Sequence, residues 1–163
     1  MIRPLTQADA TEVASLIRVA FATLSAPVSP PPSALLETAG TIASIFAQGG
    51  GGAAAERDGR IVGTCIWQQK NGGLYVGRLS VAISARGQGI ARALLAAAET
   101  EARRRGLPKL LLSTRLVLTD NRHLFASFGF TEVATHAHPG FTEPTFVDLE
   151  KPLCENDILR KKR

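Results

Sequence analysis

Residues 79–95 read LSVAISARGQGIARALL, and this stretch decides the fold. An apolar run ends in a short polar turn, which passes through RGQGIA directly into the apolar periodicity of a helix. Gly87 and Gly89 allow the backbone to approach a ligand without a Cβ in the way. The free N–H groups at the start of the helix, reinforced by the positive end of its dipole, favour an anion. The stretch therefore predicts a backbone site for a phosphate or pyrophosphate.

Two common phosphate-binding loops do not fit this stretch. The nucleoside-triphosphate loop needs a Lys-Ser or Lys-Thr pair after its last glycine, where this chain has Ile90-Ala91. The dinucleotide fingerprint needs a third glycine where this chain has Arg92. We therefore exclude both classes.

The hexapeptide from Arg86 to Ala91, RGQGIA, resembles the acetyl-coenzyme A signature of the GNAT N-acetyltransferase family, Arg/Gln-x-x-Gly-x-Gly/Ala. Its flanks are similar to the same family: LSV before it, then ARALLAAAETEARRRG, LPKLLLST, NRHLFASFGF and FVDLEKPL. The resemblance covers residues 74–153 closely and residues 1–73 in general layout. It implies the GNAT acyl-CoA N-acyltransferase fold, an α/β (α+β) architecture. Its central mixed, mostly antiparallel sheet has splayed parallel central strands and is flanked by helices.

Periodicity and turn residues predict the order β-α-α-β-β-β-α-β-α-β-β, which is that of the GNAT fold. The expected elements are a strand at 2–3, helices at 6–24 and 33–48, a flexible loop at 49–52, a hairpin of 53–57 and 60–69, a strand at 74–81, a helix at 89–105, a strand at 109–114, a helix at 120–127, and strands at 130–138 and 144–151. A long helix joins the strands at 74–81 and 109–114, so we expect these two to be parallel neighbours.

The composition predicts one globular domain, residues 1–153, followed by a basic C-terminal tail, residues 154–163. The chain has 163 residues, of which 45% are hydrophobic and 20% charged. No apolar run approaches the roughly eighteen residues of a membrane span. The first ten residues lack the pattern of a signal peptide. We therefore expect a cytoplasmic protein with no membrane partner.

The net charge of +5 raises the question of nucleic acid. Runs at 103–105 and 160–163 supply seven of the nineteen basic residues. The first run falls in the last turn of a predicted helix, where cations meet the negative end of the dipole, and the second is a solvated terminus. The chain shows no aromatic platform for single strands. We expect no nucleic-acid partner, and the contrary hypothesis rests on the basic tail alone.

The two cysteines, Cys65 and Cys154, are far apart and lack metal-ligand spacing. Cys65 lies in a predicted strand and is expected to be a buried, inert thiol. Cys154 follows the last strand and belongs to the tail. A disulfide is not expected in the cytoplasm.

The resemblance implies that acetyl-coenzyme A lies as co-substrate between the strands at 74–81 and 109–114. The amides of residues 88–92 would hold the pyrophosphate, and residues 79–81 would pair with the pantetheine arm as an added strand does. An amide near Val81 would polarise the thioester carbonyl and stabilise the oxyanion. The candidate coenzyme-binding residues are Leu79, Ser80, Val81, Arg86, Gly87, Gln88, Gly89, Ile90, Ala91, Arg92, Asn121 and Phe125.

Several of these residues have a second interpretation. Ser80 is either a catalytic hydroxyl or a small residue of the sheet. Arg86 and Arg92 either bind a phosphate of the coenzyme or decorate the surface. Asn121 either contacts the coenzyme, as the matching residue does in the family, or caps the short helix that it opens.

The chain departs from the family at Phe125. Many members have a tyrosine four residues before the Gly of the Gly-Phe pair, where its phenol protonates the departing thiolate. Tyr75 is the only tyrosine and lies six residues before Val81, about 20 Å along a strand. Because a thiol pKa of about 8.5 makes its anion a tolerable leaving group, we expect a slower or differently assisted enzyme. Water, Ser127 or His123 would then supply the proton.

A base is needed if the acceptor arrives as an ammonium ion. In a regular strand at 130–138, Glu132, Ala134, His136 and His138 would share one face. His138, beside Pro139-Gly140, is the better candidate for the acceptor side, because histidine titrates near neutrality. Glu56 and Glu143 are weaker candidates. The two histidines have no third ligand at matching spacing, so we expect no metal.

The sequence therefore predicts an enzyme that transfers an acetyl group from acetyl-coenzyme A to a primary amine of a small molecule, amino acid or peptide. The catalytic candidates are Val81, Ser80 and His138. Residues 25–52 and 136–144 are expected to shape the acceptor pocket of a monomer or homodimer. The alternative is a non-catalytic module that binds or senses acyl-coenzyme A.

Overall fold

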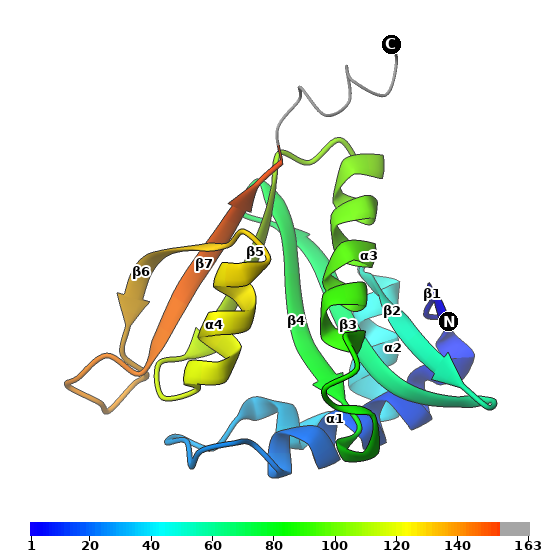
Figure 1. The fold of residues 1–163 in the computed structure, drawn as a ribbon, viewed down its shortest axis with the longest axis horizontal. Helices are drawn as coiled ribbons and strands as arrows, with labels where there is room; N and C mark the ends of the chain where they lie inside the picture. Colours follow the sequence, from blue (N-terminus) through cyan, green and yellow to red (C-terminus); the bar gives the residue numbers. More distant parts are fainter. Residues whose placement is uncertain (154–163) are drawn as a thin grey trace.

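The computed structural model describes residues 1–153, which form one seven-stranded sheet with helices on both faces (Figure 1). The strands are β1 (Ile2–Pro4), β2 (Gly51–Arg57), β3 (Arg60–Lys70), β4 (Gly73–Val81), β5 (Lys109–Arg115), β6 (Thr131–His136) and β7 (Phe146–Pro152). The helices are α1 (Ala10–Ala22), α2 (Ala39–Ala47), α3 (Ile90–Arg104) and α4 (Thr119–Ser127), with 3-10 turns η1 (Gln7–Asp9), η2 (Ser33–Leu36) and η3 (Ile83–Ala85). None of the helices in residues 1–153 has the length and apolarity that a membrane crossing requires. The predicted order of elements is confirmed.

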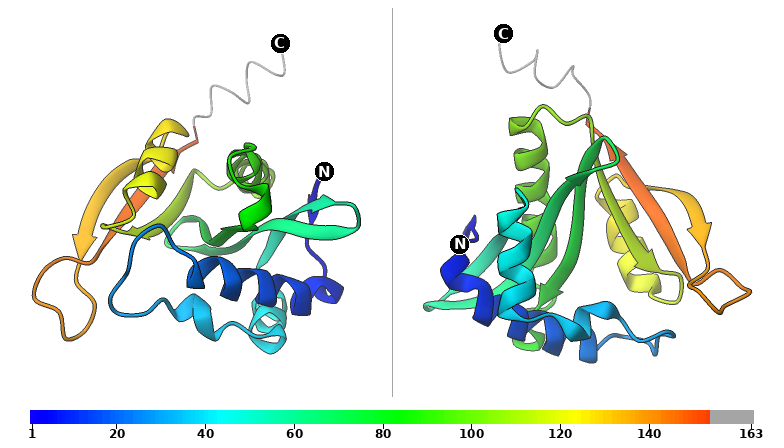
Figure 2. Two further views of the ribbon diagram at one scale, coloured as in Figure 1. Left: turned by 60° about the horizontal axis from the view of Figure 1, so that its bottom comes forward. Right: turned by 180° about the vertical axis from the view of Figure 1, so that it is seen from behind.

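The sheet separates two hydrophobic cores. α3 and α4 lie on one face, and α1 and α2 lie on the other (Figure 2). The larger core joins α3 and Phe125 of α4 to β2, β3, β4, β5 and β7, while the smaller core joins α1, α2 and η2 to β2 and β3. Helices therefore cover both faces of the sheet, as apolar sheet faces require.

β4 and β5 are the parallel pair at the centre of the sheet, whose strand order is β1-β2-β3-β4-β5-β7-β6. They pair only at Leu74 with Leu110 and at Tyr75 with Leu111, and then diverge (Figure 1). β5 pairs with β7 along its full length, so its other edge is left open beyond Leu111. The expected splayed parallel strands are confirmed.

A β-bulge sits in β4 where the two strands have parted. The register against β3 shifts between the pairs Thr64–Ser80 and Ile66–Gly77, and Arg78 has a φ of 55°. Positive φ is unusual for a residue with a side chain. Such a bulge bends a strand and redirects its side chains, which turns the end of β4 away from β5.

The single helix predicted over residues 33–48 is wrong. η2 ends at Leu36, Glu37 is extended, and α2 begins after Thr38. The Thr38 hydroxyl accepts a hydrogen bond from the Thr41 amide at 3.2 Å, and the Thr41 hydroxyl accepts one from the Thr38 amide at 2.9 Å. This reciprocal cap starts a new helix inside an apolar pattern that periodicity alone reads as continuous.

The flexible loop predicted at residues 49–52 is also wrong, because β2 begins at Gly51. Gly51 and Gly52 pair with Trp67 and Ile66 of β3. A Cβ on Gly52 would lie 2.3 Å from the Cys65 carbonyl oxygen. The glycine therefore marks a close approach of two backbones within the sheet.

Cys65 is fully buried, as expected, and burial raises the pKa of its thiol to about 12. A thiol with such a pKa carries almost no thiolate at neutral pH, which makes it unreactive. Cys154 and the basic tail at 160–163 lie outside the described residues.

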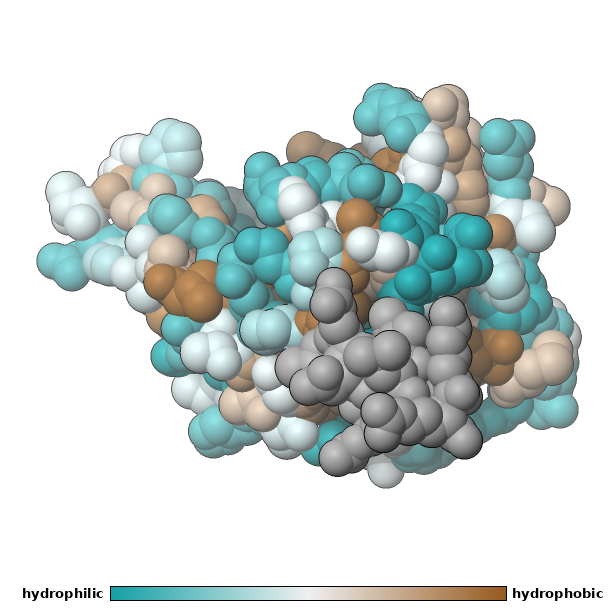
Figure 3. All heavy atoms as spheres, turned by 90° about the horizontal axis from the view of Figure 1, so that it is seen from above, coloured by the Kyte–Doolittle hydropathy of each residue, from teal (hydrophilic) through white to brown (hydrophobic). Residues whose placement is uncertain are grey.

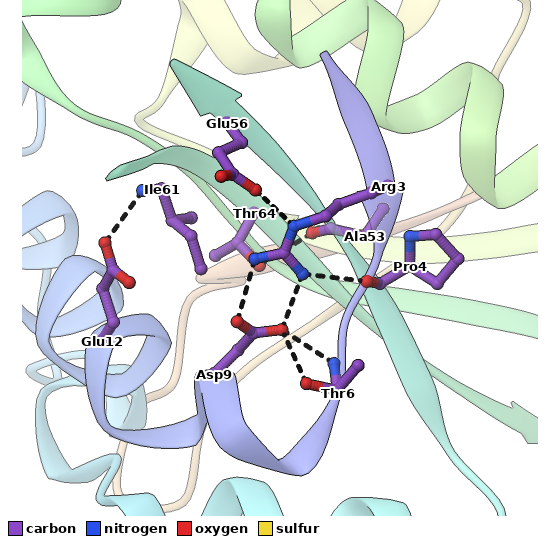
Figure 4. A network of polar contacts seen from close by, with 9 residues as sticks. All are labelled: Arg3, Pro4, Thr6, Asp9, Glu12, Ala53, Glu56, Ile61 and Thr64. Carbon is purple, nitrogen blue, oxygen red and sulfur yellow. Dashed lines mark hydrogen bonds and ion pairs between the residues drawn. The ribbon is translucent and has the colours of Figure 1, made fainter. Parts of the chain in front are cut away.

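A polar network fixes the edge of the sheet (Figure 4). Arg3 of β1 donates hydrogen bonds to both carboxylate oxygens of Asp9 at 2.8 and 2.9 Å, and to Glu56 of β2. The Arg3 guanidinium lowers the pKa of Asp9 to about 2. Glu12 accepts a hydrogen bond from the Ile61 amide at 2.8 Å, which ties α1 to β3. These contacts hold α1 against the sheet.

The basic run at 103–105 closes α3, as predicted. Arg103 pairs with Glu99 at 3.3 Å, and Arg105 pairs with Glu101 at 2.9 Å. Hydrophilic side chains dominate the described surface at this end of the molecule (Figure 3). The run is therefore a partly neutralised helix end in which Arg104 is the most exposed of the three.

We predict that Gly52→Ala lowers the free energy of unfolding by about 1–3 kcal/mol, because the added methyl would overlap the Cys65 carbonyl and force the strands apart. Gly40→Ala in α2 is the matched control, since a Cβ there meets nothing closer than 3.6 Å. The control should raise stability by about 0.4–1 kcal/mol. Urea denaturation measures both, and equal stabilities for the two variants would contradict the close approach.

Candidate active site

A cavity of about 1210 Å³ lies where β4 and β5 diverge. Its wall is formed by the end of α1, η2, β4, the start of α3, the end of β5 and α4. Nearly all the predicted coenzyme-binding residues line it: Leu79, Ser80, Val81, Arg86, Gly87, Gly89, Ile90, Ala91, Arg92, Asn121 and Phe125. Gln88 does not, and its side chain contacts Arg57.

The start of α3 has the open backbone geometry from which the sequence predicts an anion site. Gly89 is the N-cap with a φ of 80°, no side chain caps the helix, and the Ala93 amide donates the first helical hydrogen bond to the Gly89 carbonyl at 3.1 Å. The amides of residues 90–92 therefore precede the helical ladder. A Cβ on Gly87 or Gly89 would meet no atom within 4 Å, so the backbone is open to the cavity. This cradle fits a phosphate group.

The end of β4 presents a backbone edge to the gap. The Ala82 amide donates to the Val62 carbonyl of β3 at 2.8 Å. Because the N–H groups along a strand alternate between its two edges, the Val81 N–H points away from β3, toward the gap. The Val81 carbonyl lies on the same edge and accepts a hydrogen bond from Arg86 Nε at 3.1 Å.

Ser80 and Arg86 are both engaged with the protein. The Ser80 hydroxyl is buried and donates to the Arg78 carbonyl at 2.9 Å, across the bulge. Arg86 also reaches the Thr23 hydroxyl at 3.2 Å, which joins the end of β4 to the end of α1. Both side chains thus hold the shape of the site. Arg92 contacts the Ser127 hydroxyl of α4 and lies beside the cradle.

Asn121 does not open α4, so the capping interpretation is wrong. α4 begins at Thr119 with Leu118 as N-cap, and Asn121 lies in its first turn, facing the cavity. Phe125 is buried and packs edge-to-face against Phe130 with centroids 6.0 Å apart. Of the other proposed proton donors, neither His123 nor Ser127 lines the cavity. Tyr75 does, at the last pairing of β4 with β5.

The regular strand expected over 130–138 is wrong, because β6 has an irregularity between Glu132 and Ala134 and ends at His136. The rings of His136 and His138 both lie against Phe146, with centroids 5.1 and 4.8 Å away. His136 Nε2 lies 2.7 Å from Asp148 Oδ2 and does not line the cavity. His138 lines it from the following loop, with its Nδ1 in contact with the Thr145 hydroxyl. Burial, and then the charge of Arg115, lower the pKa of His138.

The two weaker base candidates lie outside the cavity lining. Glu56 is paired with Arg3 at the far edge of the sheet, and Glu143 lies in the exposed loop before β7. In residues 1–153 no group of three or more potential ligands is placed to hold a metal ion.

Sequence reasoning missed five charged residues of the cavity lining, namely Glu37, Lys70, Arg78, Arg115 and Asp120. Glu37 is 8% exposed and its carboxylate accepts a hydrogen bond from Arg78 Nε at 3.0 Å. The Arg18 guanidinium donates to the Glu37 carbonyl at 2.6 Å, which fixes this segment to α1. A charged residue inside an otherwise apolar strand was the available signal for Arg78. Glu37 lies between η2 and α2, in a segment that the sequence predicts as continuous helix, and nothing in the sequence marks it as a cavity residue.

The cavity is electropositive. Five cationic and two acidic side chains line it, and Glu37 is already paired with Arg78. A cleft lined mainly by one sign of charge attracts ligands of the opposite sign. The arrangement therefore suits an anionic ligand at the cradle and a second, smaller ligand on the side of α1 and β5.

A model of the acetyltransferase (GNAT) family matches residues 15–130. The chain belongs to this family. It is 37% identical over 78 residues to an acetyltransferase of Agrobacterium fabrum, a match that spans 48% of this chain and 56% of the length of that curated relative.

Solved structures of GNAT proteins share the fold over almost the whole chain. A ribosomal-protein-alanine N-acetyltransferase from Brucella melitensis superposes with a TM-score of 0.75 at 24% identity, covering 94% of this chain and 99% of its own. The structure of yncA from Salmonella typhimurium with its cofactor acetyl-CoA superposes with a TM-score of 0.73 at 18% identity, covering 95% and 94%. At these identities the likeness shows the fold.

We predict that Glu37→Gln lowers the free energy of unfolding by about 1–3 kcal/mol, because it leaves the Arg78 guanidinium without its charged partner in a mostly buried position. Glu132→Gln is the control, since the Arg122–Glu132 pair is exposed on both sides. It should cost less than about 1 kcal/mol. Thermal or urea denaturation measures the free energy of unfolding of both variants. A larger loss of stability in Glu132→Gln than in Glu37→Gln would contradict the structural role of Glu37.

Proposed function

We propose that the chain is an acetyl-coenzyme A-dependent N-acetyltransferase that acts on a primary amine. One observation carries this proposal: the Val81 N–H and the open amides at the start of α3 face the same cavity. The Val81 N–H can donate a hydrogen bond to a thioester carbonyl, while the amides at the start of α3 can donate to a diphosphate. Family membership and the acetyl-CoA in a structural relative support the choice of ligand.

Binding would rest on the backbone. The amides of residues 88–92 would hold the pyrophosphate, with Arg92 beside them, and residues 79–81 would hydrogen-bond the pantetheine arm. Asn121 and Phe125 of α4 would border the arm on the opposite side. Ser80 and Arg86 would keep the end of β4 in the required position through their contacts to the Arg78 carbonyl and Thr23.

Chemistry would follow from alignment and one hydrogen bond. When bound, acetyl-coenzyme A supplies a thioester whose carbonyl carbon the amine attacks. The Val81 N–H would stabilise the negative charge that develops on the carbonyl oxygen. The walls of the cavity would hold the amine at contact distance, which replaces a bimolecular encounter by an oriented one.

Two protons must move. His138 would accept the proton of the ammonium group, because its lowered pKa keeps the imidazole neutral near pH 7. Phe125 offers no hydroxyl to the departing thiolate, so water would supply the second proton. A general acid contributes roughly 10²–10⁴-fold, and a thiolate leaves tolerably without one, so we expect slow turnover.

The second candidate is a module that binds acyl-coenzyme A without turning it over. It is favoured by the buried phenyl ring of Phe125, which stands where many relatives have a phenol. Release of thiol from acetyl-coenzyme A with a panel of amines separates the two candidates. Binding without any thiol release would favour the module.

We predict that Gly89→Asp weakens coenzyme A binding at least about tenfold, because the new carboxylate would repel the diphosphate across a few ångström. Aspartate is one of the residues that adopt a positive φ most readily, so α3 should still form. Isothermal titration calorimetry measures the dissociation constant.

Gly59→Asp is the control for this prediction. Gly59 has a φ of 74° and open space around its Cβ, as Gly89 does, but it lies in the β2–β3 turn outside the cavity. The Gly59→Asp variant should bind coenzyme A with the same dissociation constant as the unaltered protein. Unchanged affinity in Gly89→Asp would refute the cradle.

We predict that kcat/KM falls on acidification with a limb below pH 6.5, the usual pKa of histidine, because burial and Arg115 both lower the pKa of His138. A protonated His138 cannot accept a proton, so activity is present above this pKa and lost below it. The limb should be absent in His138→Gln and should not move between acceptors whose amines differ in pKa. A limb that follows the acceptor, or that persists in the variant, would remove His138 from this role.

A further inference from the structure

Arg115 at the end of β5 is the arginine of the cavity without a partner. Its Nη1 atom is buried and has no hydrogen-bond partner, and within residues 1–153 no side-chain hydrogen bond or ion pair joins Arg115 to another residue. The other arginines that line the cavity differ in this respect. Arg78 is bound to Glu37, Arg86 to Val81 and Thr23, and Arg92 to Ser127.

Two acids of the surrounding elements are already engaged, and no ion pair within residues 1–153 joins Arg115 to Asp120, the other acid of the cavity lining. Asp148 of β7 accepts the Ser113 hydroxyl at 2.7 Å with one oxygen and lies 2.7 Å from His136 Nε2 with the other. Glu37 is occupied by Arg78 and the Thr41 hydroxyl. Because burying a polar atom without a partner is costly, a ligand that accepts a hydrogen bond from Arg115 Nη1 would account for its position. The lowered pKa of Arg115, caused by its burial, reflects the same lack of a counter-charge.

The side chain of Arg115 lies on the acceptor side of the sheet. Leu110 and Leu112 of β5 belong to the core beneath α3. Since side chains alternate along a strand, Ser113 and Arg115 point to the opposite face. Arg115 is paired there in register with Phe146.

His138 completes this wall of the cavity. Its ring lies 4.8 Å from the ring of Phe146, measured between centroids, and the charge of Arg115 reaches it. A guanidinium, an aromatic ring and an imidazole thus meet on one wall. A guanidinium offers a planar fork of donors that matches a carboxylate or a phosphate-type group.

We propose that Arg115 binds an acid group of the acceptor, so that the substrate is an amine that also carries a carboxylate or a phosphate-type anion. The inference rests on the proposed acetyltransferase function and specifies its substrate class. The acid lies against Arg115 and Phe146, while the amine lies toward His138 and the end of β4. Five cationic side chains against Glu37 and Asp120 leave the cavity lining with a net positive charge, which favours such a ligand.

The test compares matched amines. Alanine, leucine and phenylalanine are each presented as the free amino acid, as the amide, as the decarboxylated amine, and as the aminophosphonate with the same side chain. Thiol release from acetyl-coenzyme A gives kcat/KM for each. The acid-bearing amines should exceed their amides and decarboxylated partners at least about tenfold, as a charge-assisted hydrogen bond implies. Comparing kcat/KM between each amino acid and the aminophosphonate with the same side chain shows which acid group is preferred.

Arg115→Gln should lower kcat/KM about ten- to hundredfold for the preferred acid and leave the amides and plain amines nearly unchanged. Arg104→Gln is the control, because Arg104 is exposed on α3 and does not line the cavity. Unchanged coenzyme A affinity by calorimetry shows that Arg115→Gln is folded. The kcat/KM values are compared at a pH above the acid limb, because the charge of Arg115 lowers the pKa of His138 and its removal moves that limb in any case. If Arg115 acted only through His138, all acceptors would slow equally there.

The outcomes separate the two proposals. Amides and plain amines acetylated as fast as the acids, or an equal loss on all acceptors in Arg115→Gln, would overturn the acid site and leave the acetyltransferase standing. Coenzyme A binding with no acetylation of any acid-bearing amine would also count against the acid site. Absence of both coenzyme A binding and thiol release would instead overturn the proposed function.

Discussion

β4 and β5 are parallel neighbours that pair at only two positions, and the functional part of the chain depends on how they part. Beyond Tyr75 and Leu111 the strands diverge, and a buried sheet must then leave backbone groups without strand partners. Those groups are available to a ligand that adds to the edge. The bulge at Arg78 and the tie from Ser80 across it fix the direction in which the Val81 N–H points. Arg86 anchors the same corner to α1.

The divergence also separates two chemical environments. On the side of α3 and α4 the cavity offers backbone amides at a helix start, which suit a diphosphate, with Arg92 beside them. On the side of α1, β5 and the loop before β7 it offers side chains, above all Arg115 and His138. Backbone contacts are independent of side-chain identity, so the first environment is suited to a shared coenzyme. The second is where we propose that an acceptor is selected.

The sequence was most informative where local physics decides the structure. The glycines at 87 and 89 with the helix after them predicted the cradle, and the long helix predicted the parallel pair. It failed where tertiary contact decides. The reciprocal cap of Thr38 broke a helix that looked continuous, and the Gly52–Cys65 approach made a strand of a glycine run. Glu37 and Arg115 went unseen because neither belongs to a motif, and only the fold brings them to the cavity.

Amide hydrogen exchange, followed residue by residue with and without coenzyme A, tests most directly whether this divergence is the ligand site. The account predicts slower exchange at Val81 and at residues 88–92 on adding the coenzyme, with no change at the β1–β2 edge that Arg3 holds. Slowed exchange elsewhere in the molecule, with these amides unaffected, would contradict it.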